Sequence, residues 1–366
     1  MPIPDQRDKD QARASLTAWF ERTVPGAANV VLSEVTGPAF TGFSSETLIF
    51  DADWDEGSVH HHEGFVARVQ PTGFTLFPDP MFDPQWEVMK ALSEQTDVPL
   101  PTMWRLEKDS SVLGSPFLVM GRVDGEAPPD NPPYSFEGWL KDAPAEQQAK
   151  VWWTGIEAMA KVHDADWRTL GIDVEGPDSH YLVGLDAQLD YYEKFLADTA
   201  GDSPQPILAA ANQWLRTHQP APVTPELCWG DSRLGNILFV DFEARAVLDW
   251  EMVCLGDPQQ DLAWWIYFDR HHCENLGMPR IAGFPAYEDA VAWWEERTGR
   301  TADQLEYYTV FAGWRFGVIM VRLGQMMKGL DILPMESDYE QNNSATQFLV
   351  KLLDLPTAAE PETDAS

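Results

Sequence analysis

The feature that most constrains this chain is a loop and hairpin between residues 228 and 251 that carries two carboxylates and one amide. An apolar run at 227–229 ends in a loop that contains Asp231 and Asn236. The next residues predict a strand over 237–240, a turn over 241–245 and a strand over 246–248, after which Asp249 follows directly. A hairpin holds the loop and Asp249 at a fixed separation, so we expect the three polar groups to form one rigid site.

Two carboxylates and an amide in this arrangement suit phosphoryl transfer. One carboxylate can orient an attacking hydroxyl and accept its proton, while an amide oxygen and a second carboxylate can hold Mg²⁺ against nucleotide phosphates. We therefore predict that Asp231 acts on the hydroxyl and that Asn236 and Asp249 bind Mg²⁺. The competing interpretation is an ordinary β-hairpin with polar turn residues.

At these residues the chain resembles a known family. Trp229-Gly230-Asp231 through Asn236, then Leu248-Asp249-Trp250-Glu251, is similar to the H-G-D-x-x-x-x-N … (I/L)-D-(W/F)-E signature of aminoglycoside phosphotransferases and choline-kinase-like small-molecule kinases. Gly256-Asp257-Pro258 and Asp261-Leu262-Ala263 extend the resemblance downstream. Trp229 stands where the family usually has His, which in such loops is generally a scaffold residue, so we expect activity to survive the change.

The resemblance implies an α+β, bilobal, protein-kinase-like fold. We expect an N-terminal nucleotide-binding lobe with an antiparallel sheet at 1–120, a hinge at 121–125, a mostly helical C-terminal lobe with the catalytic loop at 126–356, and a disordered tail at 357–366. Apolar periodicity predicts helices in the C-terminal lobe, the last of them a buried spine. These helices are expected at 147–164, 185–198, 206–217 and 303–326.

The N-terminal lobe carries the expected contacts to ATP. Strands at 30–35 and 46–50 flank a glycine-bearing turn that could lay backbone N–H groups over phosphates, with Gly42 and Ser44 as the best candidates. Arg68, in a strand at 65–69, occupies the position where the resemblance implies a phosphate-binding cation. The alternative for Arg68 is an edge-strand side chain that faces solvent. Backbone groups near Met120 and Arg122, in the implied hinge, are expected to contact adenine.

Two features of this lobe remain open from sequence alone. In a helix at 83–94, the position that normally orients the strand cation holds Gln85, and Glu87 lies about 200° further round the helix, so either could meet Arg68. The run His60-His61-His62 invites a metal site, but a solvated hairpin tip is the favoured interpretation.

Further residues of the C-terminal lobe have expected supporting roles. His163 lies on an apolar helix face and is interpreted as a core histidine that braces the catalytic loop, in preference to a catalytic base. The resemblance assigns Asp261 to the same bracing. Arg233 could neutralise the transferred phosphoryl group or form a structural salt bridge. Several residues lie where similar kinases shape the acceptor pocket, although core packing explains the two tryptophans equally well: Trp264, Trp265, Tyr267, Asp269 and Glu274.

Composition limits the partners and the compartment. Lys and Arg total 25 against 59 Asp and Glu, and the net charge of -34 disfavours nucleic acid and anionic membranes. That charge could attract a cationic substrate, but general solvation of an acidic surface is the simpler explanation. Three cysteines form no disulfide framework, the charged start is unlike a secretory signal, and the most apolar segment, 316–321, is far too short to span a bilayer. We therefore expect a cytoplasmic protein, and the oligomeric state is not readable.

The acceptor is a small molecule with a hydroxyl group, but the sequence does not identify it. Similar proteins act on aminoglycosides, choline, sugars, homoserine or hydroxyacyl thioesters. The Arg68 strand and the Trp229 loop resemble the acyl-CoA-dehydrogenase-associated and bacterial uncharacterised branch more than the resistance enzymes. The alternative function is a nucleotide-binding pseudokinase, which Trp229, Gln85 and Arg68 keep open.

Overall fold

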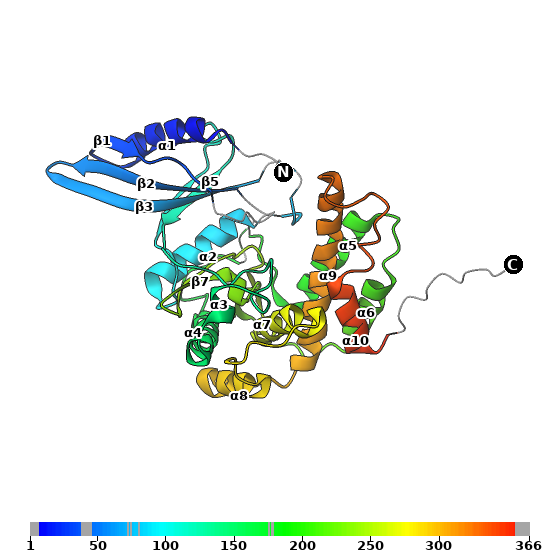
Figure 1. The fold of residues 1–366 in the computed structure, drawn as a ribbon. Coiled ribbons are helices and arrows are strands. Elements are labelled where there is room, and N and C mark those ends of the chain that lie inside the picture. Colours follow the sequence, from blue (N-terminus) through cyan, green and yellow to red (C-terminus); the bar gives the residue numbers. More distant parts are fainter. Residues whose placement is uncertain are drawn as a thin grey trace.

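The chain folds into two lobes of different composition (Figure 1). The structure is a computed structural model that describes residues 7–37, 46–71, 73, 75–79, 81–174, 176 and 179–355. A five-stranded antiparallel sheet forms one lobe and a largely helical bundle forms the other, which confirms the predicted α+β fold. Gly42, Ser44 and the tail at 357–366 lie outside the described residues, and the lobe and hinge boundaries remain a prediction.

The N-terminal lobe is one sheet with a helix on one face. The strand order is β1-β2-β3-β5-β4, and α1 covers one face of the sheet (Figure 1). Leu16, Trp19 and Phe20 of α1 pack against Phe50 and Phe65 of the sheet in one buried cluster. The elements are α1 (Lys9–Thr23), β1 (Ala27–Leu32), β2 (Glu46–Glu56), β3 (Val59–Val69), β4 (Met103–Glu107) and β5 (Phe117–Gly121).

The β2–β3 hairpin is longer than the sequence indicates, because both strands continue through the polar stretch at 53–63. Buried and half-buried residues alternate along β2, as a strand with one face on a core requires. The three histidines lie near the tip and contact strand β2. His60 Nδ1 lies 2.9 Å from Asp55 Oδ1, His62 Nδ1 lies 2.9 Å from Asp53 Oδ1, and the His61 ring stacks on Trp54. Within the described part of the chain, no three or more acidic, histidine or cysteine side chains are grouped as metal ligands.

The C-terminal lobe is built mainly from helices, and α2 joins it to the sheet. Val88, Met89 and Leu92 of α2 share a buried cluster with Trp152 and Ile156 of α4. The helices are α2 (Phe82–Gln95), α3 (Trp139–Asp142), α4 (Ala145–Asp164), α5 (Gly184–Ala200), α6 (Pro206–Thr217), α7 (Gln259–His272), α8 (Tyr287–Thr298), α9 (Leu305–Gly329) and α10 (Ser344–Leu353). Two short 3₁₀ helices are η1 (Leu234–Asn236) and η2 (Glu274–Leu276).

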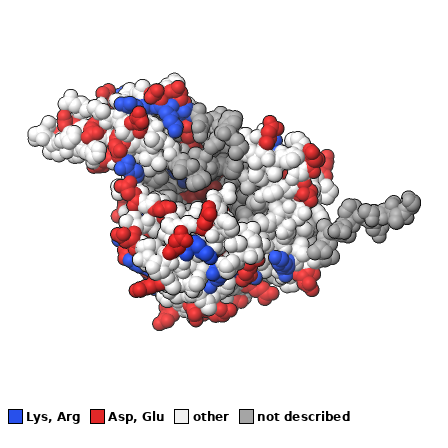
Figure 2. Space-filling view, in the orientation of Figure 1, with Lys and Arg blue, Asp and Glu red and all other residues white. Residues whose placement is uncertain are grey.

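Helix α9 is the buried spine that the sequence predicts. It packs against α5, α6, α7 and α10, and most of its side chains are buried. No helix among the described residues is both long enough and apolar enough to cross a membrane. On the face drawn in Figure 2, acidic side chains are scattered over both lobes, as expected for general solvation of an acidic surface.

Two small sheets flank the candidate catalytic loop, residues 229–236. Strands β6 (Glu226–Cys228) and β9 (Cys254–Gly256) pair with each other, and β7 (Ile237–Val240) pairs with β8 (Glu243–Val247). The predicted turn at 241–245 is wrong in length, because the turn comprises only Asp241 and Phe242, with φ of 52° and 64°. Left-handed conformations at both turn residues match the twist of the flanking strands, so β8 begins three residues earlier than expected.

Candidate active site

The loop after β6 places Asp231 among three side-chain donors. Trp264 Nε1 donates to Asp231 Oδ1 at 2.7 Å, and Asn236 Nδ2 donates to Asp231 Oδ2 at 2.6 Å. Arg233 Nε lies 3.1 and 3.2 Å from the two carboxylate oxygens. The Asp231 side chain keeps 11% of its surface exposed. Asp231 is therefore an oriented carboxylate that remains accessible from outside.

Arg233 is held between two carboxylates. Besides Asp231, its guanidinium forms an ion pair with Asp130, from the Pro-rich segment that precedes α3. The pKa of Arg233 is raised because the attraction of Asp130 and Asp231 outweighs the cost of burial. These contacts are the structural salt bridge that the sequence left open as an alternative.

Asn236 directly precedes β7, and Asp249 lies two residues after the end of β8. Asn236 ends η1, and Asp249 follows β8 in a left-handed conformation with φ of 59°. Asp249 Oδ1 is buried and makes no hydrogen bond to any described residue. Burial raises the pKa of Asp249, Arg68 opposes this rise and Asp231 adds to it, so the two carboxylates lie close enough to repel each other. A buried carboxylate oxygen that accepts no hydrogen bond from a described residue, beside an amide and a second carboxylate, is a donor set that fits Mg²⁺.

Arg68 crosses from the sheet to the C-terminal lobe. Its Nη2 lies 3.6 Å from Asp249 Oδ1, and its Nη1 lies 3.4 Å from Gln85 Oε1. Glu87 instead accepts hydrogen bonds from the hydroxyl of Tyr181 at 2.9 Å and from the backbone N–H of Asp173 at 3.0 Å. The structure therefore pairs Arg68 with Gln85, and it places the Arg68 side chain, which is 14% exposed, at the site instead of in solvent.

The implied hinge shows fewer free backbone groups than expected. Met120 lies within β5, opposite Val66 and Met103 of the neighbouring strands. The backbone N–H of Arg122 donates to Gly64 O at 2.8 Å, and its side chain forms ion pairs with Asp51 and Asp124. This N–H is already used, so the Arg122 carbonyl is the backbone group of that residue that could reach a nucleotide.

Asp261 accepts two backbone hydrogen bonds from the loop that contains Asp231. Its Oδ2 accepts the backbone N–H of Trp229 at 2.7 Å, and its Oδ1 accepts that of Gly230 at 2.9 Å. Gly230 has a φ of 92°, and a Cβ there would overlap the backbone of Met252, so only glycine fits this turn. The geometry confirms the predicted bracing role of Asp261.

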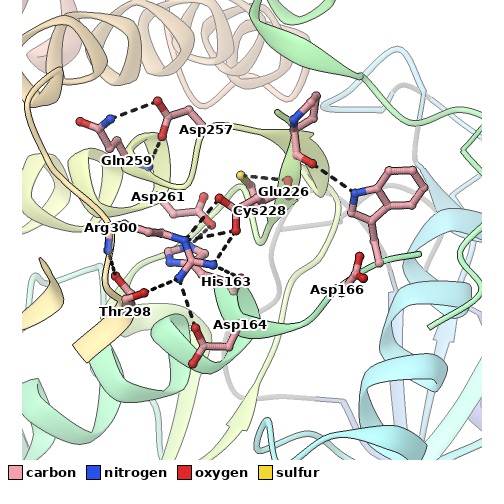
Figure 3. Close-up of polar contacts among 12 residues, drawn as sticks. His163, Asp164, Asp166, Glu226, Cys228, Asp257, Gln259, Asp261, Thr298 and Arg300 are labelled. Atoms are coloured by element: carbon pink, nitrogen blue, oxygen red, sulfur yellow. Dashed lines mark hydrogen bonds and ion pairs between the residues drawn. The ribbon is translucent and has the colours of Figure 1, made fainter. Parts of the chain in front are cut away.

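His163 supports Asp261 and is itself fixed in one tautomer. Its Nδ1 accepts from Trp294 Nε1 at 3.2 Å, and because an indole nitrogen can only donate, the proton of a neutral His163 must be on Nε2. Nε2 then donates to Asp261 Oδ2 at 3.1 Å. Arg300 contacts the His163 carbonyl at 2.6 Å and pairs with both Asp164 and Glu226 (Figure 3). His163 is thus a core residue, as predicted, and its ring does not contact Asp231.

Trp229 takes the place of the usual histidine without entering the site. The side chain is fully buried, packs near Trp250, and donates from Nε1 to the Leu248 carbonyl at 2.9 Å. This hydrogen bond ties the loop directly to the residue before Asp249. The substituted position therefore has the scaffold role expected of it.

The residues predicted to shape the acceptor pocket divide into different roles. Trp264 contacts Asp231, whereas Trp265 packs in the core against Trp152. Asp269 pairs with Tyr134, Arg280 and Tyr287, and Glu274 pairs with Arg270; these contacts are structural.

A cavity that the sequence analysis missed adjoins this site. We name it the α5–α9 cavity. It measures about 220 Å³ and contains none of the five predicted pocket residues. Its lining comprises Phe77, Asp79, Met81, His180, Leu182, Gln188, Tyr191, Tyr192, Glu251, Met252, Val253, Cys254 and Arg315. The available sequence signal was Arg315, a cation within α9, a helix whose side chains are mostly buried.

Comparison with known proteins identifies the family. The model of the phosphotransferase enzyme family, APH, matches residues 53–306, which is more than half of the chain and includes both lobes. The chain belongs to this family. The match extends from the β2–β3 hairpin to the start of α9 and therefore contains Arg68, Asp231, Asn236 and Asp249.

Curated relatives of this phosphotransferase-family chain have acyl-CoA dehydrogenase names. The probable acyl-CoA dehydrogenase IBR3 of Arabidopsis thaliana is 28% identical over 248 residues, covering 65% of this chain and 28% of that protein. Acyl-CoA dehydrogenase family member 11 of Rattus norvegicus is 30% identical over 281 residues, covering 72% of this chain and 34% of that protein. The chain spans about a third of the length of these relatives or less. Their names agree with the predicted resemblance to the acyl-CoA-dehydrogenase-associated branch.

Solved structures share the fold. A putative aminoglycoside phosphotransferase from Ralstonia eutropha JMP134 aligns with a TM-score of 0.64 at 22% identity, over 93% of this chain and 96% of that one. A thermostable mutant of aminoglycoside phosphotransferase APH(4)-Ia, in ternary complex with ADP and hygromycin B, aligns with a TM-score of 0.54 at 16% identity, over 93% and 98% of the two chains. At these identities the likeness establishes the kinase-like fold.

Proposed function

We propose that this protein is an ATP- and Mg²⁺-dependent phosphotransferase that moves the γ-phosphoryl group of ATP to a hydroxyl group of a small molecule. The observation that carries the proposal is the convergence of four polar side chains from both lobes. Asn236 Nδ2 lies 2.6 Å from Asp231 Oδ2, and Arg68 Nη2 lies 3.6 Å from Asp249 Oδ1. Membership of the phosphotransferase family and the ADP complex of a structural neighbour support it further.

Asp231 is the residue to which we assign the acceptor hydroxyl. Its donors, Trp264, Asn236 and Arg233, fix the carboxylate in one orientation, so a hydroxyl that reaches it is held in one direction. In this role Asp231 accepts the hydroxyl proton as the oxygen attacks.

Asn236 and Asp249 are the residues that would hold Mg²⁺. The metal ion, when bound, supplies positive charge that offsets the charge of the phosphate oxygens. The buried Asp249 Oδ1 without a hydrogen-bond partner among the described residues supports this assignment, because a hard cation would satisfy it. Asn236 directs its amide nitrogen toward Asp231, which turns its amide oxygen away from Asp231.

The nucleotide contacts are assigned to the N-terminal lobe. Arg68 would bind phosphate oxygens with its planar guanidinium, and its position beside Asp249 supports that role. Gly42 and Ser44 are proposed to cover the phosphates, and backbone groups near Met120 and Arg122 are proposed to contact adenine.

Arg233 has two competing roles within this proposal. The assigned role is to neutralise the transferred phosphoryl group. The alternative, supported by the ion pairs of Arg233 with Asp130 and Asp231, is a salt bridge that orients Asp231. An Asp130→Asn variant distinguishes them. If Arg233 acts through the salt bridge, turnover should fall in Asp130→Asn. If Arg233 binds the phosphoryl group, turnover in Asp130→Asn should stay near that of the wild type.

The direct test is an Asp231→Asn variant assayed for Mg²⁺-dependent phosphate incorporation from ATP. A panel of aminoglycosides, hydroxyacyl-CoAs and amino alcohols serves as acceptors. We expect turnover to fall on the order of 10²–10³, as for the loss of one preorganised charge contact. Asp241→Asn is the matched control, because it removes an acid from the far end of the adjacent hairpin, in a left-handed conformation that Asn tolerates. Wild-type turnover by Asp231→Asn would refute the assignment.

The rival function is a nucleotide-binding pseudokinase. Of the three residues that kept it open, Trp229 contacts the Leu248 carbonyl, and Gln85 and Arg68 contact each other, so none of them displaces Asp231, Asn236 or Asp249. ATP binding without any Mg²⁺-dependent turnover would support the pseudokinase. We further propose that the protein works in the cytoplasm on a small molecule and not on nucleic acid.

A further inference from the structure

A buried arginine without an acceptor lines the α5–α9 cavity. Arg315 is 1% exposed, and its Nε and Nη2 are buried without a hydrogen bond to any described residue. A buried N–H that has lost its water and gained no acceptor costs stability, and more so on a charged group. Such an arginine in the wall of a cavity indicates that the cavity binds a ligand with hydrogen-bond acceptors.

The surroundings of Arg315 do not neutralise it. Its guanidinium carbon lies 4.5 Å from the Trp264 ring and 4.6 Å from the Phe311 ring. Ring faces attract a cation but leave the in-plane N–H groups without lone pairs.

The other charged groups of the cavity have partners of their own. Asp79 Oδ2 lies 2.8 Å from His180 Nδ1, and Glu251 also has an interaction partner. Among the described residues, no acidic side chain forms a hydrogen bond to Nε or Nη2 of Arg315.

The cavity adjoins the proposed site of the acceptor hydroxyl. Trp264, whose ring lies against Arg315, donates from Nε1 to Asp231 Oδ1 at 2.7 Å. The cavity wall at 251–254 also begins two residues after Asp249. One indole ring thus separates the guanidinium from the carboxylate that is assigned to the hydroxyl.

We propose that the α5–α9 cavity binds the anionic group, a carboxylate or a phosphate, of a hydroxylated acceptor whose hydroxyl reaches Asp231. The inference rests on the proposed function and specifies its substrate class. A guanidinium fork donates two parallel hydrogen bonds to a carboxylate or phosphate, so Arg315 determines specificity. A polycationic acceptor would place positive charge against Arg315 and be disfavoured, which reverses the preference that the net charge of the chain suggests.

The test compares acceptors that differ only in charge. Straight-chain ω-hydroxy acids of three to eight carbons, the matching ω-hydroxy amides and the matching ω-hydroxyalkyl phosphates are assayed as acceptors with Mg²⁺ and ATP. We expect kcat/KM to favour acids or phosphates over amides by about tenfold to a hundredfold, the range for hydrogen bonds to charged groups. The two anionic series show which anion is bound. Equal use of acids and amides by the wild type would overturn the proposal.

Two variants in α9 test whether Arg315 causes the preference for anionic acceptors. Arg315→Met should abolish the preference for anions, whereas Arg322→Met removes the same charge from the same helix and should keep it. Arg322 contacts the Thr75 carbonyl and is not assigned to either site. Should Arg315→Met fail to fold, Arg315→Lys carries the test, because it keeps the charge, loses the fork and should reduce the preference. An unchanged preference in the variant that folds would overturn the role of Arg315.

Binding without nucleotide separates this inference from the proposed function. The ω-hydroxy acid with the highest kcat/KM, or the whole series if no turnover occurs, is tested for thermal stabilisation of the protein without ATP. Stabilisation by acids but not by amides, lost in Arg315→Met, supports the anion site even if the protein transfers no phosphate. Absence of stabilisation, together with active turnover of amides, overturns the anion site while the kinase function stands.

Discussion

Replacing Asp261 by Asn tests how the catalytic loop is held in place. The carboxylate accepts three N–H groups: the backbone N–H of Trp229 at 2.7 Å, that of Gly230 at 2.9 Å, and His163 Nε2–H at 3.1 Å. An Asn side chain has the same shape but only one acceptor oxygen. Its NH₂ group must therefore face at least one N–H, and His163 cannot switch tautomer because Trp294 already donates to its Nδ1.

The size of the effect follows from these contacts. A hydrogen bond to an ionised group contributes about 1.5–3 kcal/mol, and a buried donor left without an acceptor costs about 1–3 kcal/mol. Losing one such bond and leaving its donor unpaired predicts a loss of about 3–5 kcal/mol in the free energy that keeps the loop closed. Protection of the Trp229 and Gly230 amides against hydrogen exchange should then fall on the order of 10²–10⁴.

The measurement is hydrogen exchange on the segment at 226–234, combined with Mg²⁺-dependent ATP turnover, which should fall with the loss of protection. Asp257→Asn is the matched control. Asp257 is also buried, but it accepts from the backbone and side chain of Gln259 and does not contact the loop. The reasoning is refuted if Asp261→Asn keeps wild-type protection at Trp229 and Gly230, or if Asp257→Asn lowers it equally.

Two further predictions concern ATP binding and pH. Arg68→Ala should raise the KM for ATP about tenfold to a hundredfold by removing a charged hydrogen-bond donor, whereas Glu87→Gln should leave it near wild type; initial rates across ATP concentrations decide between these outcomes. Burial lowers the pKa of His271 to about 3, against about 6.5 in the unfolded chain, so unfolding takes up a proton below pH 6.5. Its contribution to stability is therefore present above pH 6.5 and lost as the pH falls toward 3, by up to about 1.4 kcal/mol per pH unit. In His271→Phe, the free energy of unfolding measured with urea should depend less steeply on pH between 6.5 and 4.5. An unchanged slope would contradict the lowered pKa of His271.

The sequence predicted most of the fold because its local signals agreed with its packing. Helix α6 matches its predicted bounds, because Pro206 stands in its first turn and Leu208, Ala211 and Leu215 give it a single buried face. Helix α7 was not predicted as a helix. Nearly all of its side chains are buried, which removes the alternation of polar and apolar faces that reveals a helix. The β7–β8 turn was misplaced because Asp241-Phe242 lacks the glycine that usually marks left-handed turn residues.

The site was predictable where chain position alone brings residues together. Asp231, Asn236 and Asp249 lie on one loop and one hairpin, so their proximity follows from local structure. The choice between Gln85 and Glu87 depended on how α2 packs beneath the sheet, which a single sequence does not encode locally. The α5–α9 cavity depended on segments up to 238 residues apart in the chain, from Phe77 to Arg315, and tertiary packing alone brings them together.

The most direct test of the central claim is the binding of a divalent cation with nucleotide at Asp249. Mn²⁺, which replaces Mg²⁺ and is visible by electron paramagnetic resonance, is titrated into the protein with a non-hydrolysable ATP analogue. We predict a protein-bound Mn²⁺ signal in the wild type, and at least about a tenfold loss of Mn²⁺ affinity in Asp249→Asn, because one anionic ligand is removed. Unchanged Mn²⁺ affinity in Asp249→Asn would contradict the account of the site.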